Sequence, residues 1–232
     1  MEHFTWLSLL PGGLPDHTLT ATLVTLLLIT WGFVARRQFA AASDAVIPDG
    51  TLTARNTLEI FVEWFAGLTE SVLGHRGRRY IHLYGTFCIF ILVSNLIGLV
   101  PGFSPPTSNF NVTLALGLTS FVMYNYFGVR EHGLGYLKHF VGPIWWLGFL
   151  MVPLELIDNF VRPLTLALRL AANMTADHLV LGIFTDLTKL VIPTVFYMLG
   201  AFVCLVQTFV FTLLSLVYVS LAVAGHEEHG EH

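Results

Sequence analysis

Charged residues and cysteines are scarce in this chain of 232 residues, and this scarcity limits the kind of protein it encodes. Charged side chains make up only 11% of the sequence, whereas 55% of the residues are hydrophobic and the mean hydropathy is +0.72. A soluble domain needs more surface charge than this, so the composition predicts a polytopic membrane protein. The two cysteines, Cys88 and Cys204, lie in separate apolar segments without a CxxC or Cys/His spacing, which favours buried thiols over a disulfide or a metal site.

Motifs of soluble enzymes are also missing. The sequence has no Gly-rich phosphate-binding loop, no HExxH motif and no nucleophile elbow. We therefore expect no nucleotide chemistry in this chain, which is predicted not to be an enzyme by itself. Its net charge of -4 gives no reason to expect a nucleic-acid partner.

Long apolar runs predict about five transmembrane helices, since about 20 apolar residues suffice to cross the hydrocarbon. The predicted segments are an anchor helix at about 18–35, a helical hairpin at about 80–128, a long helix at about 143–182 and a second long helix at about 188–224. The last run has no charge from Val191 to Ala224, so as a helix it would extend about 51 Å against about 30 Å of hydrocarbon. This helix must tilt, break or protrude.

Residues at about 52–73 predict an amphipathic helix at the membrane interface. Its apolar side chains recur at helical spacing: Leu58, Phe61, Val62, Phe65, Leu68 and Val72. Charged side chains occupy the other faces: Arg55, Glu59, Glu63 and Glu70. The predicted fold is therefore an all-α integral membrane protein with about five transmembrane helices, one interfacial helix and two long tilted C-terminal helices, in a single domain over residues 1–232.

The basic residues predict the orientation in the membrane. If the helices alternate, nearly all basic loop residues fall on one side: Arg36, Arg37, Arg55, Arg76, Arg78, Arg79, Arg130 and Lys138, with only Lys189 opposite. Cytoplasmic loops carry an excess of Lys and Arg, so we expect the N-terminus outside and the C-terminus in the cytoplasm. The tail at 225–232 contains histidines that could hold a metal, but an acidic, solvated terminus is the favoured interpretation.

Arg169 lies in the middle of a run that otherwise predicts a membrane-buried helix. An arginine at the centre of a spanning helix costs at least about 2.5 to 3.5 kcal/mol, so such residues usually face a water-filled path or a partner. The alternative is a side chain that snorkels to the headgroups. Apolar residues on both sides leave no interface nearby, which favours the functional interpretation.

Three charged residues of this helix share one face. Glu155, Arg162 and Arg169 are spaced by seven residues and lie within about 40° of one another, and Asn173 joins them four residues later. Asp158 can pair with Arg162 at i,i+4, so a structural salt bridge is the alternative role for those two residues.

His178 and Asp177 follow on a different side of the same helix. His178 lies nine residues after Arg169 and points to roughly the opposite side. Along the axis, Glu155 is about 21 Å on one side of Arg169 and His178 about 13 Å on the other. Polar groups thus lie on different faces of the helix, on either side of a fixed cation, as two offset half-channels would require. Pro163 can kink the helix between Glu155 and Arg169, so spacing fixes the angle between those two residues less well than the angle between Arg169 and His178.

Two other classes of membrane protein fit less well. A haem protein needs two facing histidines inside the bilayer, and only His178 lies deep, so we expect no cofactor. A secondary transporter is the second alternative, but the chain shows no internal repeat and no pair of broken half-helices.

The segment PLELIDNFVRPLTLALRLAANMTADHL resembles the a subunit of the membrane sector of rotary F-type ATP synthases. The RLxxNM signature of that family appears as Arg169, Leu170, Asn173 and Met174, and the closing helix QTFVFTLLSLVYVSLA, with Gln207, also resembles the family. Weaker similarity surrounds Asn95 in SNLIGLVPG and covers PPTSNFNVTLALGL. The resemblance extends over most of the chain from about Leu52 onward.

The resemblance implies a proton-conducting stator in a bacterial inner membrane. Protons would pass through one half-channel to carboxylates on a rotating ring of c subunits and leave through the second, with Arg169 separating the two. The implied partners are the c-ring, b-type peripheral stalk subunits, the remainder of the synthase and the lipid bilayer, with ATP chemistry on other subunits.

The resemblance also implies roles for individual residues. His178 occupies a position of the proton uptake path, whereas Asp177 departs from the small residue common there, so either can be the principal uptake group. Glu155 matches the carboxylate of the release path. Asn173 and Gln207 would be polar neighbours of Arg169, although Gln207 has an alternative role in fastening two helices, and Asn95 either lines the uptake path or packs the hairpin.

Overall fold

The structure is a computed structural model that describes residues 15–41, 53–133, 148–188 and 191–224. Every regular element in these ranges is helical, which confirms the all-α prediction. The chain divides into two compact units, residues 1–106 and residues 107–232. The histidines of the tail and the start of the predicted helix at 143 lie outside the described residues, and the single-domain organisation stays a prediction.

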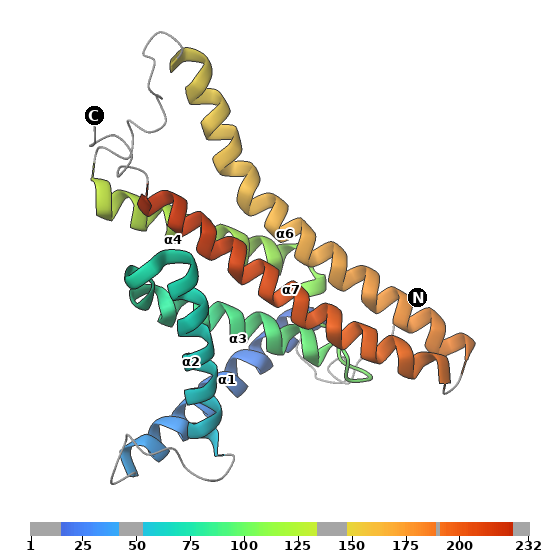
Figure 1. Cartoon of the computed structure of the whole chain (residues 1–232). Helices are drawn as coiled ribbons and strands as arrows, with labels where there is room; N and C mark the ends of the chain where they lie inside the picture. The colour runs from blue at the N-terminus through green and yellow to red at the C-terminus, as the bar shows by residue number, and fades with distance from the viewer. Residues whose placement is uncertain (1–14, 42–52, 134–147, 189–190, 225–232) are drawn as a thin grey trace. The chain divides into compact units, whose positions relative to one another are not determined.

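The N-terminal unit contains the helices α1 (Asp16–Ala41), α2 (Ala54–Leu73), η2 (Gly74–Tyr80) and α3 (Ile81–Ile97), and α2 packs against both α1 and α3 (Figure 1). Helix α1 continues past the predicted end at residue 35, through two arginines. Helix α2 begins where Thr53 accepts a hydrogen bond from the Asn56 amide at 3.3 Å, a typical N-cap.

Helix α2 has the predicted apolar side, on which Phe65 is fully buried. Arg55, which the sequence places off this apolar side, is buried as well, with 2% of its surface exposed. Its Nε donates to Glu59 Oε1 at 2.8 Å, and its guanidinium lies 5.2 Å from the centre of the Phe39 ring. The Arg55 amide also donates to Gln38 Oε1 at 2.9 Å. Arg55 therefore fastens the start of α2 to the end of α1.

The C-terminal unit consists mainly of α4 (Phe110–His132), α6 (Gly148–Leu187) and α7 (Val191–Ala224), preceded by η3 (Pro106–Ser108), which spans the boundary between the units. The three long helices run alongside one another and contact each other pairwise (Figure 1). Their shared core is apolar and fully or almost fully buried: Leu166, Ala167 and Leu170 from α6, and Phe211, Leu216 and Val219 from α7. At the far end of α4, His132 Nε2 lies 2.8 Å from the Val223 carbonyl oxygen of α7.

Four of the described helices are long and apolar enough to cross a membrane: Asp16–Ala40, Gly77–Ile97, Phe110–His132 and Pro193–Val223. Together they confirm an integral membrane protein. Helix α6 does not reach this hydropathy, because acidic and basic side chains recur along its length. Its role as the fifth crossing stays a prediction that depends on how these charges are accommodated.

Candidate functional site

Arg169 lies in the middle of α6 and is exposed on the surface of the C-terminal unit. Its neighbours Leu166 and Leu170 are buried against the other helices, so Arg169 points away from the core. Within the part of the chain that the structure describes, Arg169 makes no hydrogen bond and no ion pair. The helix thus presents an arginine that is available to an external partner.

One turn after Arg169, two amides join α6 to α7. Asn173 Nδ2 donates to Gln207 Oε1 at 2.7 Å, and Gln207 is 4% exposed. The other amide atom of Gln207, Nε2, is buried and has no hydrogen-bond partner among the described residues. The structure therefore brings together two residues that the sequence only places on separate helices. The bond is the contact that the fastening alternative requires, and the role of Gln207 beside Arg169 stays a prediction.

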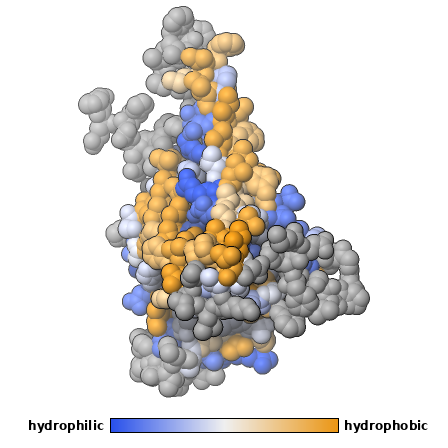
Figure 2. Space-filling view, turned by 90° about the vertical axis from the view of Figure 1, so that its right-hand side faces the viewer, coloured by the Kyte–Doolittle hydropathy of each residue, from blue (hydrophilic) through white to orange (hydrophobic). Residues whose placement is uncertain are grey.

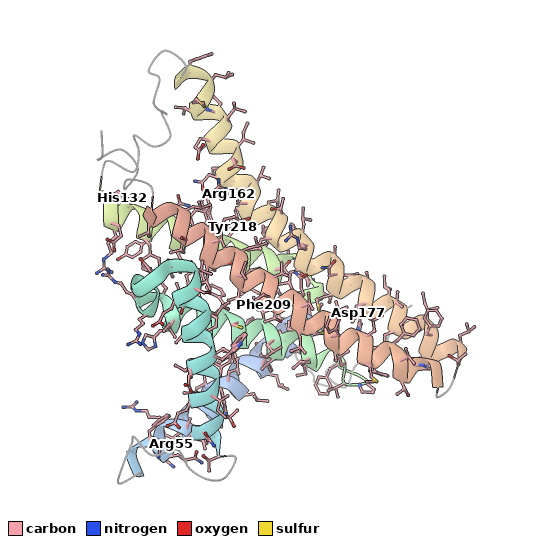
Figure 3. The ribbon with its side chains drawn as sticks, viewed as in Figure 1. Arg55, His132, Arg162, Asp177, Phe209 and Tyr218 are labelled. Atoms are coloured by element: carbon pink, nitrogen blue, oxygen red, sulfur yellow. The ribbon has the colours of Figure 1, made fainter. Side chains whose placement is uncertain are left out.

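Asp177 faces α7 one turn beyond Asn173. Asp177 is half-buried (Figure 3). Its carboxyl group acts electrostatically on the thiol of Cys204, which is buried in α7. Cys204 precedes Gln207 by three residues and lies on the same face of α7. Asn173 and Asp177 of α6 therefore face Gln207 and Cys204 of α7 along one seam, while His178 is half-buried beside it.

On the other side of Arg169, Arg162 and Asp158 form the salt bridge that their spacing suggested. Arg162 Nε donates to Asp158 Oδ2 at 3.0 Å. The Arg162 guanidinium also lies 5.6 Å from the centre of the Tyr218 ring of α7 (Figure 3). Glu155 is half-buried and forms no hydrogen bond or ion pair with the described residues. The contacts of Asp158 and Arg162 thus match their alternative, structural role, and the role of Glu155 stays a prediction.

A polar cluster that the sequence analysis missed lies between α4 and α6. The Tyr124 hydroxyl donates to the Asn159 carbonyl at 3.0 Å and also contacts Asn159 Oδ1. Asn159 Nδ2 donates to Asn125 Oδ1 at 3.3 Å. One sequence signal could have pointed to this cluster: Pro163 lacks an amide hydrogen, so the Asn159 carbonyl four residues earlier needs another donor.

Asn95, the remaining predicted path residue, lies in α3 of the N-terminal unit and is 1% exposed. Such burial suits a packing role inside that unit. Its place in a proton path stays a prediction.

Comparisons with known proteins place these residues in a family context. The family model described as ATP synthase A chain matches residues 18–220. The chain is similar to ATP synthase subunit a of Bdellovibrio bacteriovorus, with 42% identity over 224 residues that cover 95% of this chain and 98% of the relative. It is also similar to ATP synthase subunit a 1 of Syntrophotalea carbinolica, with 43% identity over 224 residues that cover 95% and 92% of the two chains.

Proposed function

Because the chain belongs to the ATP synthase A chain family, we propose that it is the proton-conducting stator subunit of a rotary ATP synthase. Two offset half-channels would load and unload carboxylates on the rotating c-ring, and Arg169 would separate them. The exposure of Arg169, without an ion pair in the described part of the chain, is the observation that carries this proposal.

The chemistry of arginine suits a barrier between two proton paths. Arg keeps its proton at every physiological pH, so it cannot pass a proton from one half-channel to the other. A cation within a few ångström of a carboxyl group favours the ionised form, and Arg169 would therefore drive a passing ring carboxyl to release its proton. The ring carboxylate must also leave Arg169 again as the ring rotates, so the two groups must not form a permanent bidentate ion pair.

The seam between α6 and α7 would form the uptake side. Asp177 lies at this seam and His178 lies beside it, and both side chains can carry protons. The hydrogen bond between Asn173 and Gln207 holds the two helices together between this pair and Arg169. Glu155 lies on the N-terminal side of Arg169 along α6, whereas Asp177 and His178 lie on the C-terminal side. Glu155 would accept protons for release.

The outer surface near Arg169 supports an apolar partner. Large apolar side chains are exposed on both long helices: Leu164 and Leu168 on α6, and Phe202, Leu205 and Phe209 on α7. The N-terminal part of α6, at the top of Figure 2, is mostly hydrophobic on the face shown there. A ring of apolar helices would cover such a surface and place its carboxylates within reach of Arg169.

The remaining assignments follow from the same proposal. The chain would lie in the bacterial inner membrane with its N-terminus outside and its C-terminus in the cytoplasm. Its partners would be the c-ring, b-type stalk subunits and the rest of the synthase, in which other subunits carry the ATP chemistry.

The test is ATP-driven proton pumping in inverted membrane vesicles that contain the whole complex, with Arg169→Ala compared with wild type. We expect pumping to disappear while the complex stays assembled, and passive proton leak to rise because the barrier is lost. Arg36→Ala removes an exposed arginine from α1 and serves as the matched control. Normal pumping by an assembled Arg169→Ala complex would overturn the proposal.

A further inference from the structure

Pro163 interrupts the backbone hydrogen bonds of α6 between Glu155 and Arg169. A proline has no amide hydrogen, so the Asn159 carbonyl lacks its usual helix partner. In the interior of a membrane, a neighbouring helix, a side chain or an ordered water must satisfy such a group, because lipid cannot do so. The question is which group takes the place of the missing donor.

Tyr124 of α4 supplies this donor. Its hydroxyl lies 3.0 Å from the Asn159 carbonyl oxygen and also contacts Asn159 Oδ1, so its single hydrogen is shared between two acceptors of the same residue. The position is buried: Tyr124 is 2% exposed and Asn159 is 9% exposed. The bond joins residues 35 positions apart and therefore crosses between helices. The backbone group that Pro163 leaves open is thus capped by another element.

A chain of amides fixes the Asn159 side chain in the same place. Asn159 Nδ2 donates to Asn125 Oδ1 at 3.3 Å, and Asn125 Nδ2 donates to the Phe121 carbonyl of its own helix at 2.8 Å. Only the oxygen of the Asn159 amide can then face the Tyr124 hydroxyl. Both the backbone and the side chain of Asn159 are therefore held by α4.

The aromatic neighbours of Tyr124 hold its ring. The Tyr124 ring packs edge-on against Phe121 and at a tilt against Tyr218 of α7, with ring centres 5.5 Å and 6.0 Å apart. Tyr218 in turn lies beneath the guanidinium of Arg162. Three helices therefore meet around the hydroxyl that caps Asn159.

Gly117 also brings α4 close to α6, at Pro163 and Ala167. A Cβ atom at position 117 would lie 2.7 Å from the Pro163 carbonyl oxygen and 3.3 Å from the Ala167 Cβ. Gly117 and Tyr124 are seven residues apart, so they lie on nearly the same face of α4. This face contacts α6 from Asn159 to Ala167.

We propose that Tyr124 and Asn159 are positioning residues for proton transfer: the Tyr124 hydroxyl replaces the hydrogen bond that Pro163 removes, and so sets the direction of α6 between Glu155 and Arg169. This inference rests on the proposed function, because it assumes that these two groups act at opposite ends of a proton path. A small change in the direction of α6 at Pro163 would displace Glu155 considerably. Glu155 lies about 12 Å along the helix from Pro163, so a change of about 10° in the bend moves it by about 2 Å.

The test is a double-mutant cycle between Tyr124→Phe and Pro163→Ala, measured as ATP-driven proton pumping per assembled complex. Tyr124→Phe keeps the ring and removes only the hydroxyl, and we expect it to lower pumping about three- to tenfold. The Pro163→Ala substitution restores a backbone amide that bonds the Asn159 carbonyl within the helix. In that background, Tyr124→Phe should change pumping by less than about twofold.

The controls separate this inference from a general effect on folding and from the proposed function. Tyr126→Phe removes an exposed hydroxyl from the same helix and should leave pumping unchanged. If Tyr124→Phe reduces assembly, the amount of assembled complex replaces proton pumping as the quantity compared in the double-mutant cycle. If Tyr124→Phe lowers pumping equally in the wild-type and Pro163→Ala backgrounds, or does not lower it at all, the proposed role of the Tyr124 hydroxyl is wrong. Loss of Arg169 tests the proposed function separately, because it should raise passive leak, whereas Tyr124→Phe should not.

Discussion

The polar residues of α6 differ in the contacts that they make. Arg169 is directed outward, away from the core of the three helices. Asn173 and Asp177 face α7, where Gln207 and Cys204 lie. A barrier that meets a moving partner must be external, whereas groups that guide protons through the protein must lie between helices.

The position of Asp177 leads to a prediction about proton uptake. Asp177→Asn removes the titratable group from the seam between α6 and α7 and keeps its size. We expect ATP-driven proton pumping to fall by at least about tenfold, because positioned acid–base groups contribute factors of this order or more.

His178→Ala, assayed beside it, decides which residue dominates uptake. A smaller loss in His178→Ala assigns the main role to Asp177. The opposite order of effects, with Asp177→Asn near wild type, would contradict the prediction.

Helix α6 depends on its neighbours more than its length suggests. It contains two prolines, Pro153 and Pro163, and charged side chains recur along it. Helix α4 compensates for one of these weaknesses by capping the Asn159 carbonyl and packing its backbone against Pro163. The sequence predicts α4 only as half of a hairpin, yet in the structure it supports α6.

The close approach of α4 to α6 can be tested at Gly117. Gly117→Ala would place a methyl group 2.7 Å from the Pro163 carbonyl oxygen, so one of the two helices must move. We expect a loss of stability of about 1 to 3 kcal/mol, typical of an overpacked core, visible as a lower midpoint for thermal unfolding of the detergent-solubilised complex.

Gly67→Ala is the matched control for this substitution. A Cβ at Gly67 in α2 meets nothing within 4 Å, and alanine favours a helix, so stability should be unchanged or slightly higher. A Gly117→Ala complex as stable as wild type would show that α4 and α6 can separate without cost.

The described part of the chain combines four helices that are apolar enough to cross a membrane with the more polar helices α2 and α6. Packing against α4 and α7 reduces the exposure of α6 to lipid, and the salt bridge of Arg162 with Asp158 neutralises two of its charges. We therefore expect that α6, the predicted fifth crossing, needs these tertiary contacts to insert, since isolated charges in hydrocarbon are costly.

The orientation can be tested at the two ends of α4. Asn111 and Glu131 are exposed near its opposite ends, and the distribution of basic residues predicts that Glu131 lies on the cytoplasmic side. In a background with both native cysteines replaced by serine, a membrane-impermeant thiol reagent should label Glu131→Cys in inverted vesicles and Asn111→Cys in right-side-out cells. The reverse pattern would invert the topology.

Periodicity and hydropathy in the sequence were sufficient to predict the helices and the relations within each one. Helix α2 begins within two residues of its predicted start, and the pairing of Asp158 with Arg162 follows from i,i+4 spacing. These features depend on local backbone geometry, which residues close in sequence determine. The resemblance in RLxxNM likewise indicated the family that the comparisons confirm.

Only the tertiary structure decided which residues meet across helices. The angle between Asp177 and His178 is fixed along α6, but the placement of α7 determines that Asp177 faces the seam. The burial of Arg55 depends on where α1 ends, and the cap on Asn159 depends on a tyrosine 35 residues away. Such contacts follow from how whole helices pack, and no spacing within one helix specifies the position of its neighbour.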